Sequence, residues 1–80
     1  MINIYTKPSC HYCTQAKNLL NRHHQVFREI PIGEEILLED VREQFPTAQT
    51  APIIVIDGVY IGGYQELQLI FESNPQLLTE

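Results

Sequence analysis

The chain has 80 residues, of which 44% are hydrophobic and 19% are charged, and its formal net charge is −5. This length and composition predict one globular domain over residues 1–80, and the acidic balance disfavours nucleic acid and acidic membrane surfaces as partners. No apolar run is long enough to span a bilayer, and the first residues lack the pattern of an export signal, so we expect a cytoplasmic protein.

Hydrophobic periodicity and turn residues divide the chain into alternating strands and helices. Ala16, Leu19 and Leu20 recur at helical spacing, which predicts the first helix. The pair Asp57-Gly58 is typical of the tight turn inside a hairpin. In chain order we expect strand, helix, strand, helix, strand, strand and helix, over residues 2–5, 10–22, 25–32, 34–45, 53–56, 59–61 and 64–73.

Acidic residues and prolines predict where the second helix begins and where the second and third helices end. Glu34 and Glu35 are suited to the positive end of a helix dipole, so they are predicted to open the second helix. Pro46 cannot continue that helix, and Asn74-Pro75 is predicted to end the third one.

The connections between strands predict the topology of the sheet. The first two strands are joined by a helix and should be parallel, with a right-handed crossover, whereas the last two should form an antiparallel hairpin. Pro31 predicts that the second strand either ends near this residue or lies at an edge of the sheet. The unbroken apolar run at residues 53–56 predicts a central strand that is covered on both faces. The fold class is therefore α/β, with a four-stranded mixed sheet flanked by three helices.

The only cysteines, Cys10 and Cys13, stand where the first predicted helix begins. Free amides and the positive dipole end at that point stabilise a thiolate, which is the nucleophilic form of cysteine, so Cys10 is expected to be the more reactive thiol. We prefer this redox interpretation to three alternatives. A zinc site would need more ligands at a suitable spacing, so no metal is expected. A structural disulfide would close almost no loop, and simple burial would not explain the position at a helix start.

Three motifs together resemble the glutaredoxin family. They are Lys7-Pro8-Ser9-Cys10-His11-Tyr12-Cys13, Thr50-Ala51-Pro52-Ile53 and Ile61-Gly62-Gly63-Tyr64. The resemblance runs through nearly the whole chain, including its length and element order. It implies a thioredoxin-like fold and a glutathione-dependent enzyme that reduces protein disulfides and glutathione mixed disulfides.

The resemblance also implies the roles of both cysteines. Cys10 matches the family's nucleophile, and Cys13 matches the resolving cysteine, which attacks the mixed disulfide formed with a protein. Two molecules of glutathione, the expected reductant and cosubstrate, would then reduce the Cys10–Cys13 disulfide. Removal of glutathione from a target requires only the nucleophile in this family.

Glutathione is expected to bind around these cysteines. In the family, the residue before a cis proline, here Ala51, pairs its backbone with glutathione, and amides at the last helix receive the γ-glutamyl carboxylate. A basic or amide side chain, here Arg42, Gln44 or Gln49, meets the glycyl carboxylate. The expected glutathione-binding residues are Lys7, Tyr12, Arg42, Thr50, Ala51, Pro52, Gly63, Tyr64, Gln65 and Glu66.

Three residues depart from the family pattern. Many relatives carry an aspartate where Gln65 stands, to capture the glutamyl ammonium, and Glu66 is the better charge match here. Lys or Arg is common where Gln49 stands, and proline or serine is commoner at His11.

These departures leave two alternatives open. One is a redoxin of the same fold that is reduced by thioredoxin reductase, although no tryptophan precedes Cys10 as in an ordinary thioredoxin. The other is a carrier in which two protomers and glutathione hold a [2Fe–2S] cluster through the first cysteine. The preferred assignment predicts a monomer whose partners are disulfide-containing or glutathionylated proteins, with ribonucleotide reductase as a candidate.

His11 provides a first testable prediction. A cationic His11 beside the thiolate would stabilise the reduced form and make the disulfide more oxidising. We therefore expect the reduction potential to rise, beyond the usual thiol dependence, as pH falls through the range in which His11 gains a proton. The potentials of the wild type and of His11→Ser are to be measured across pH, and parallel curves would reject the idea.

Overall fold

The computed structural model describes residues 1–48 and 50–73. The predicted strands and helices all occur, in the predicted order. They are β1 (Ile2–Thr6), α1 (His11–Arg22), β2 (Phe27–Pro31), α2 (Leu38–Gln44), β3 (Ile53–Ile56), β4 (Val59–Gly62) and α3 (Tyr64–Ser73). The predicted end of the last helix at Asn74-Pro75 lies outside the described residues.

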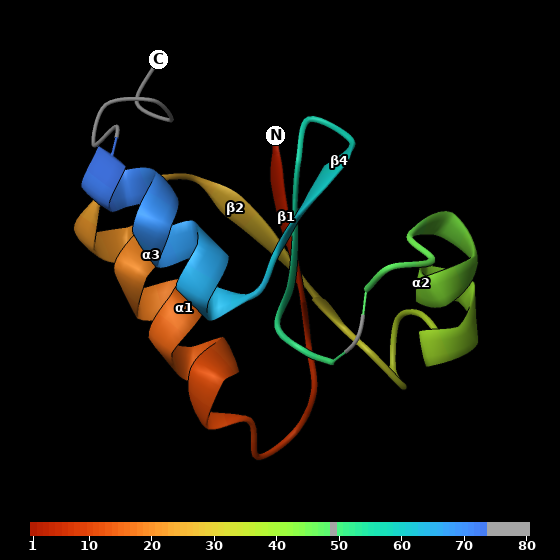
Figure 1. Ribbon diagram of the computed structural model, residues 1–80. Helices are drawn as coiled ribbons and strands as arrows, with labels where there is room; N and C mark the ends of the chain where they lie inside the picture. Colours follow the sequence, from red (N-terminus) through yellow and green to blue (C-terminus); the bar gives the residue numbers. More distant parts are fainter. Residues whose placement is uncertain (49, 74–80) are drawn as a thin grey trace.

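The strands form one mixed sheet in the order β2-β1-β3-β4. As expected, β1 pairs with β2 in parallel, and β3 forms an antiparallel hairpin with β4. Strand β1 also pairs with β3 in antiparallel register, from Ile2 opposite Ile56 to Tyr5 opposite Ile53. Helices α1 and α3 lie on one side of the sheet and α2 lies on the other, which confirms the predicted α/β architecture (Figure 1).

Strand β3 is buried on both faces because its side chains alternate between two hydrophobic clusters. Ile54 belongs to the cluster under α1 and α3, together with Leu20 and Leu67, and all three are 0% exposed. Ile53 and Val55 belong to the cluster on the α2 side. The prediction of a central strand at residues 53–56 is therefore confirmed.

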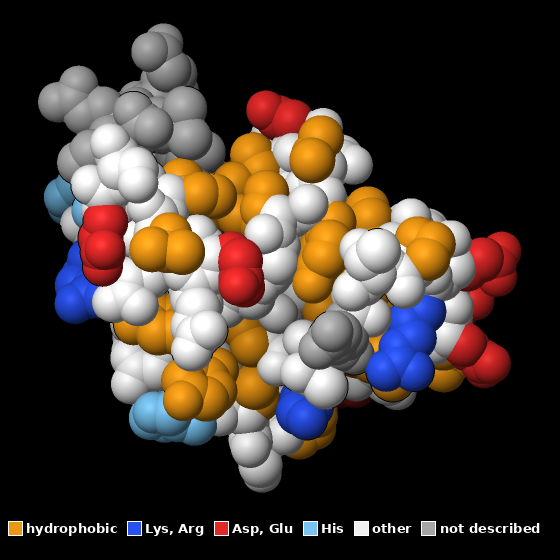
Figure 2. Space-filling model, viewed as in Figure 1, with side chains coloured by type: hydrophobic (Ala, Val, Ile, Leu, Met, Phe, Trp, Pro, Cys, Tyr) orange, Lys and Arg blue, Asp and Glu red, His pale blue; other side chains and the backbone are white. Residues whose placement is uncertain are grey.

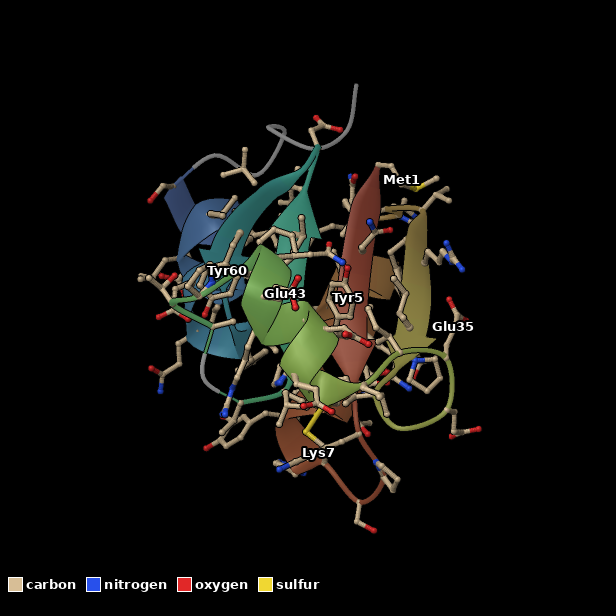
Figure 3. The ribbon with its side chains drawn as sticks, turned by 90° about the vertical axis from the view of Figure 1, so that its right-hand side faces the viewer. Met1, Tyr5, Lys7, Glu35, Glu43 and Tyr60 are labelled. Atoms are coloured by element: carbon tan, nitrogen blue, oxygen red, sulfur yellow. A yellow bond between two sulfur atoms is a disulfide. The ribbon has the colours of Figure 1, made fainter. Side chains whose placement is uncertain are left out.

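The α2 side of the sheet is closed by aromatic rings as well as by aliphatic side chains. The ring of Phe45, just after α2, lies with its centroid 6.4 Å from that of Tyr5 and 6.3 Å from that of Tyr60. Figure 3 faces this side, with α2 in front of the sheet and with Tyr5 and Tyr60 labelled on its strands. Val41 is the buried residue of α2 in this layer.

The prediction that Glu34 and Glu35 open the second helix was wrong. Their amides donate to the Pro31 carbonyl in a turn, and Gly33, at φ 93°, lets the chain reverse so that Ile32 pairs with Ile36. Helix α2 begins only at Leu38, after an extended residue, and Glu39 and Asp40 provide the acidic first turn. An ion pair with Arg28 on β2 holds Glu35 in the turn instead. The turn after Pro31 and the pairing of Ile32 with Ile36 therefore outweighed the local preference for a helix.

The strand ends place several segments at one end of the molecule. Strand β1 leads into the loop before α1, and the starts of β3 and α3 lie toward the same end (Figure 1). The second strand begins at Phe27 and ends at Pro31, so it is shorter than predicted, and it lies at an edge of the sheet. Among the described residues no helix has the length and hydrophobicity needed to cross a bilayer.

Glu29 connects three elements just behind this end. Its Oε2 accepts a 2.8 Å hydrogen bond from the hydroxyl of Thr6, a residue only 4% exposed, and it lies 3.2 Å from Lys17 Nζ on α1. The hydrogen bond from Thr6 is the main reason that the pKa of Glu29 lies below its usual value of 4.5, and Lys17 lowers this pKa further, against the effect of partial burial.

This network predicts a pH-dependent contribution to stability. Because the pKa of Glu29 is lower in the folded state, the unfolded chain binds the proton first, and the stabilisation is lost as pH falls below 4.5. Near neutral pH, Glu29→Gln should lower the free energy of unfolding by about 0.5–1 kcal/mol, because water screens a partly exposed pair. In urea titrations this difference should shrink toward zero at about pH 3.

Glu72→Gln, on an exposed part of α3, removes the same charge elsewhere and serves as the matched control. A Glu29→Gln deficit that stays constant across pH, or that equals the effect of Glu72→Gln at every pH, would contradict the assignment.

Candidate active site

Cys10 occupies the N-cap of α1. Its backbone is extended, at φ −107° and ψ 106°, and its Sγ accepts a 3.2 Å hydrogen bond from the backbone N–H of Cys13. A side-chain acceptor at this position satisfies one of the helix's free donors, and negative charge there is stabilised by the helix dipole. The short loop after β1 therefore delivers a sulfur atom to the place where a thiolate is favoured.

The two cysteines form a disulfide with a Cα–Cα distance of 5.2 Å. The two cysteines differ in their exposure to solvent. Cys13, within the first turn of α1, is 2% exposed, whereas Cys10 is only half-buried. An attacking thiol can therefore reach the sulfur of Cys10 more readily than that of Cys13. The disulfide lies near the end of β1, on the side of the molecule where Lys7 is labelled (Figure 3).

The segment before β3 lies directly against the reactive sulfur. The carbonyl oxygen of Ala51 is 3.8 Å from Cys10 Sγ, and the Ala51–Pro52 peptide bond is cis, the geometry that the resemblance implied. Pro52 is buried and has no N–H, while Ala51 remains partly exposed. The backbone of Ala51 is thus the nearest main-chain partner for a group bonded to Cys10.

A groove of about 550 Å³ extends from this point to the start of α3. Most of the residues expected to bind glutathione line it, namely Tyr12, Thr50, Ala51, Pro52, Gly63, Tyr64, Gln65 and Glu66. Thr47, Tyr60, Ile61 and Gly62 also line it and were not predicted as glutathione-binding residues. Tyr60 and Ile61 precede the glycine pair on β4, and this position was the sequence signal for them.

Two expected residues are not in the groove lining. Lys7 is exposed in the loop between β1 and α1, and Arg42 is exposed on α2. Gln44, the amide alternative on α2, is exposed too and does not line the groove. Gln49 lies outside the described residues. The structure therefore gives the groove no basic side chain among the residues that it describes.

Aromatic rings form the wall of the groove at the disulfide end. Tyr12 is 55% exposed, and its ring stacks on that of Tyr64 with centroids 5.9 Å apart and planes 30° apart. The ring of His11 meets the edge of Tyr12 at 5.6 Å, and its Nε2 lies 3.3 Å from the side-chain nitrogen of Gln15. The stacked tyrosines connect the start of α1 to the start of α3.

The far end of the groove is formed by the glycine pair and Glu66. The Oε1 of Glu66 accepts a 2.7 Å hydrogen bond from the backbone N–H of Gly63, which is the reciprocal half of a capping box. Glu66 folds over Gly62, at φ 126°, where a Cβ atom would lie 2.5 Å from Glu66 Cγ. A Cβ on Gly63 would lie 3.3 Å from the carbonyl oxygen of Pro52. Both glycines thus permit the close packing of this turn.

The family model and several of the relatives found by sequence comparison are glutaredoxins. Residues 2–61 match the family model for glutaredoxin. The chain is 36% identical over 66 residues to glutaredoxin 3 of Escherichia coli K12, covering 82% of this chain and 80% of that protein. It is 37% identical over 70 residues to the hybrid peroxiredoxin hyPrx5 of Haemophilus influenzae, where the match covers 88% of this chain but spans only 29% of that protein's length.

Solved structures give the same result. The solution structure of glutaredoxin from Brucella melitensis is 32% identical, with a TM-score of 0.74 over 98% of this chain and 88% of that one. The crystal structure of a buckwheat glutaredoxin–glutathione complex has a TM-score of 0.83 over 98% of this chain and 76% of that one; at 22% identity this likeness concerns the fold alone. The fold, the cysteine pair and the matched family model together show that the chain belongs to the glutaredoxin family.

Proposed function

We propose that this protein is a glutathione-dependent thiol–disulfide oxidoreductase that reduces protein disulfides and glutathione mixed disulfides. The glutaredoxin family and the Cys10–Cys13 pair support the thiol–disulfide chemistry. The observation that carries the proposal is the position of Cys10 Sγ. It accepts a 3.2 Å hydrogen bond from the Cys13 amide and lies 3.8 Å from the carbonyl oxygen of Ala51, which lines a groove of about 550 Å³.

The reaction begins with the reduced dithiol. The Cys10 thiolate attacks one sulfur of the target disulfide, the target's S–S bond breaks, and the departing thiolate takes up a proton. Cys13 then loses a proton and attacks Cys10 Sγ, which releases the second target thiol and forms the Cys10–Cys13 disulfide. The Cys13 amide stabilises Cys10 Sγ as the thiolate of the first step; in the second step Cys10 Sγ is the atom attacked, and the target's sulfur is the leaving group.

Glutathione is the proposed reductant of that disulfide. Its cysteinyl backbone would pair with Ala51, beside Cys10, and its γ-glutamyl group would lie at the start of α3, with its ammonium near Glu66. A buckwheat glutaredoxin has been solved as a complex with glutathione. We propose direct contacts only for residues of the groove and restrict Lys7 and Arg42 to long-range attraction.

We further propose a monomer that acts in the cytosol on disulfide-containing or glutathionylated proteins. Ribonucleotide reductase remains a candidate target. The identity to part of a hybrid peroxiredoxin adds peroxiredoxin disulfides to the candidates.

Two cysteine variants test the roles of the thiols. Cys10→Ser should abolish turnover with every substrate, whereas Cys13→Ser should keep deglutathionylation and lose most reduction of protein disulfides, because only the latter needs a resolving thiol. In Cys13→Ser, the pH profile of alkylation should show Cys10 ionising below about 8.5, the value of an unperturbed thiol. Turnover by Cys10→Ser, or an ordinary ionisation of Cys10, would overturn the mechanism.

The choice of reductant needs a separate experiment. Reduction of a protein disulfide is to be followed by NADPH consumption, with glutathione plus glutathione reductase in one assay and with thioredoxin reductase in the other. We expect turnover only in the first assay. Turnover only in the second would identify a thioredoxin-reductase-dependent redoxin. A brown dimer without reductase activity, after anaerobic reconstitution with iron and sulfide, would favour the cluster carrier.

A further inference from the structure

The charge of the groove differs sharply between its two ends. At the disulfide end, the Cys13 amide at the start of α1 donates to Cys10 Sγ, and the neighbouring residues of the lining, Tyr12, Ala51 and Pro52, are uncharged. At the other end stands Glu66, the one charged side chain that lines the groove among the described residues. Figure 2 shows acidic side chains over α3, with hydrophobic and uncharged ones beside them.

Glu66 is held in place before any partner arrives. Its Oε1 accepts the Gly63 N–H at 2.7 Å, and its stem fills the space over Gly62 that a Cβ atom would need. A carboxylate fixed in this way loses little further side-chain entropy when it meets a cation. Its charge also offsets the positive end of the α3 dipole, so this end of the groove favours cations over anions.

The groove reaches the neighbours of the reacting sulfur, since Tyr12 and Ala51 both line it. Gly63 lies against the carbonyl oxygen of Pro52, and Ala51, the residue before Pro52, has its carbonyl oxygen 3.8 Å from Cys10 Sγ. A target bonded to Cys10 through its own cysteine would therefore extend beside Glu66. In an extended chain, residues two apart face the same side, about 7 Å apart, so the side chain two positions from the target cysteine shares its face.

We propose that Glu66 selects the protein substrates of this groove, favouring disulfides whose reacting cysteine has a lysine or an arginine two residues away and disfavouring those with an acidic residue there. This inference rests on the proposed function, since it concerns the same site and the same first step. It adds a substrate class to that function, namely disulfides with a basic residue near the reacting cysteine, which should react faster with Cys10 than other disulfides.

The test is the reaction of the fully reduced protein with synthetic peptide disulfides, without glutathione or any reductase. Each substrate is a symmetric disulfide of an uncharged peptide in which one residue, two positions before or two positions after the cysteine, is Lys, Gln or Glu. Acid quenching and chromatography give the second-order rate constant of a single turnover. The ratio of the Lys to the Glu rate constant is the measured quantity.

Two matched variants separate a local charge from the general acidity of the chain. Glu66→Gln keeps an oxygen for the Gly63 N–H, since glutamine also completes a capping box, and removes the charge. Glu72→Gln makes the same change in net charge on an exposed part of α3 outside the groove. In at least one peptide series we expect Glu66→Gln to lower the Lys/Glu ratio by about 1.5- to fivefold, the range for exposed ion pairs. Glu72→Gln should leave the ratio unchanged.

Salt provides a measurement that depends on no variant. Raising the ionic strength from about 0.01 M to about 1 M should bring the wild-type ratio toward that of Glu66→Gln, because the screening length falls about tenfold. A wild-type ratio that is insensitive to salt, equal ratios in wild type and Glu66→Gln, or an equal loss in Glu72→Gln would overturn the inference. Failure to react with any peptide disulfide would instead overturn the proposed function.

Discussion

The hydrogen bond from the Cys13 amide to the sulfur of Cys10 is the contact on which the chemistry depends. It requires the chain to reach the start of α1 in an extended conformation, which the loop after β1 provides. The chemistry also requires a second segment of the chain to lie against this sulfur. That segment is the backbone of Ala51, just before β3, and the pairing of β1 with β3 holds it beside Cys10. The sheet therefore serves mainly to hold a helix start and a strand start face to face.

The sequence predicted the order of elements and the two-sided burial of β3, because these follow from local patterns of apolar residues and turns. The start of α2 could not be found in the same way. Glu34 and Glu35 do favour a helix start. The turn at Gly33, in which Ile32 pairs with Ile36, is nevertheless the more stable conformation of this segment. An ion pair between Arg28 and Glu35 attaches this turn to β2, and β2 is itself placed by pairing with β1, which brings together residues distant in sequence.

The residues of the candidate site could also be predicted only in part from the sequence. Tyr12 of the first motif and most residues of the other two motifs line the groove, because each motif stands at the start or end of an element, and these ends meet at one end of the sheet. Lys7 and Arg42 were named for their charge rather than for their place in the fold, and the structure puts both outside the groove. The fold of Glu66 over Gly62 was equally hidden, since it depends on a positive φ that the sequence permits but does not require.

The two helix starts around the groove carry opposite chemistry. Oxygen-bearing side chains are the usual N-caps, and a residue without a good acceptor there costs about 1 kcal/mol, so a sulfur at the start of α1 gives up some stability in exchange for a reactive thiolate. At the start of α3, the carboxylate of Glu66 accepts the Gly63 N–H and so occupies one of the donors that an anion could otherwise use. A substrate in the groove therefore contacts two different helix starts. At the start of α1, backbone N–H donors stabilise a developing thiolate, and at the start of α3 the carboxylate of Glu66 attracts cations. This polarity orients an extended, basic segment along the groove before any bond is exchanged.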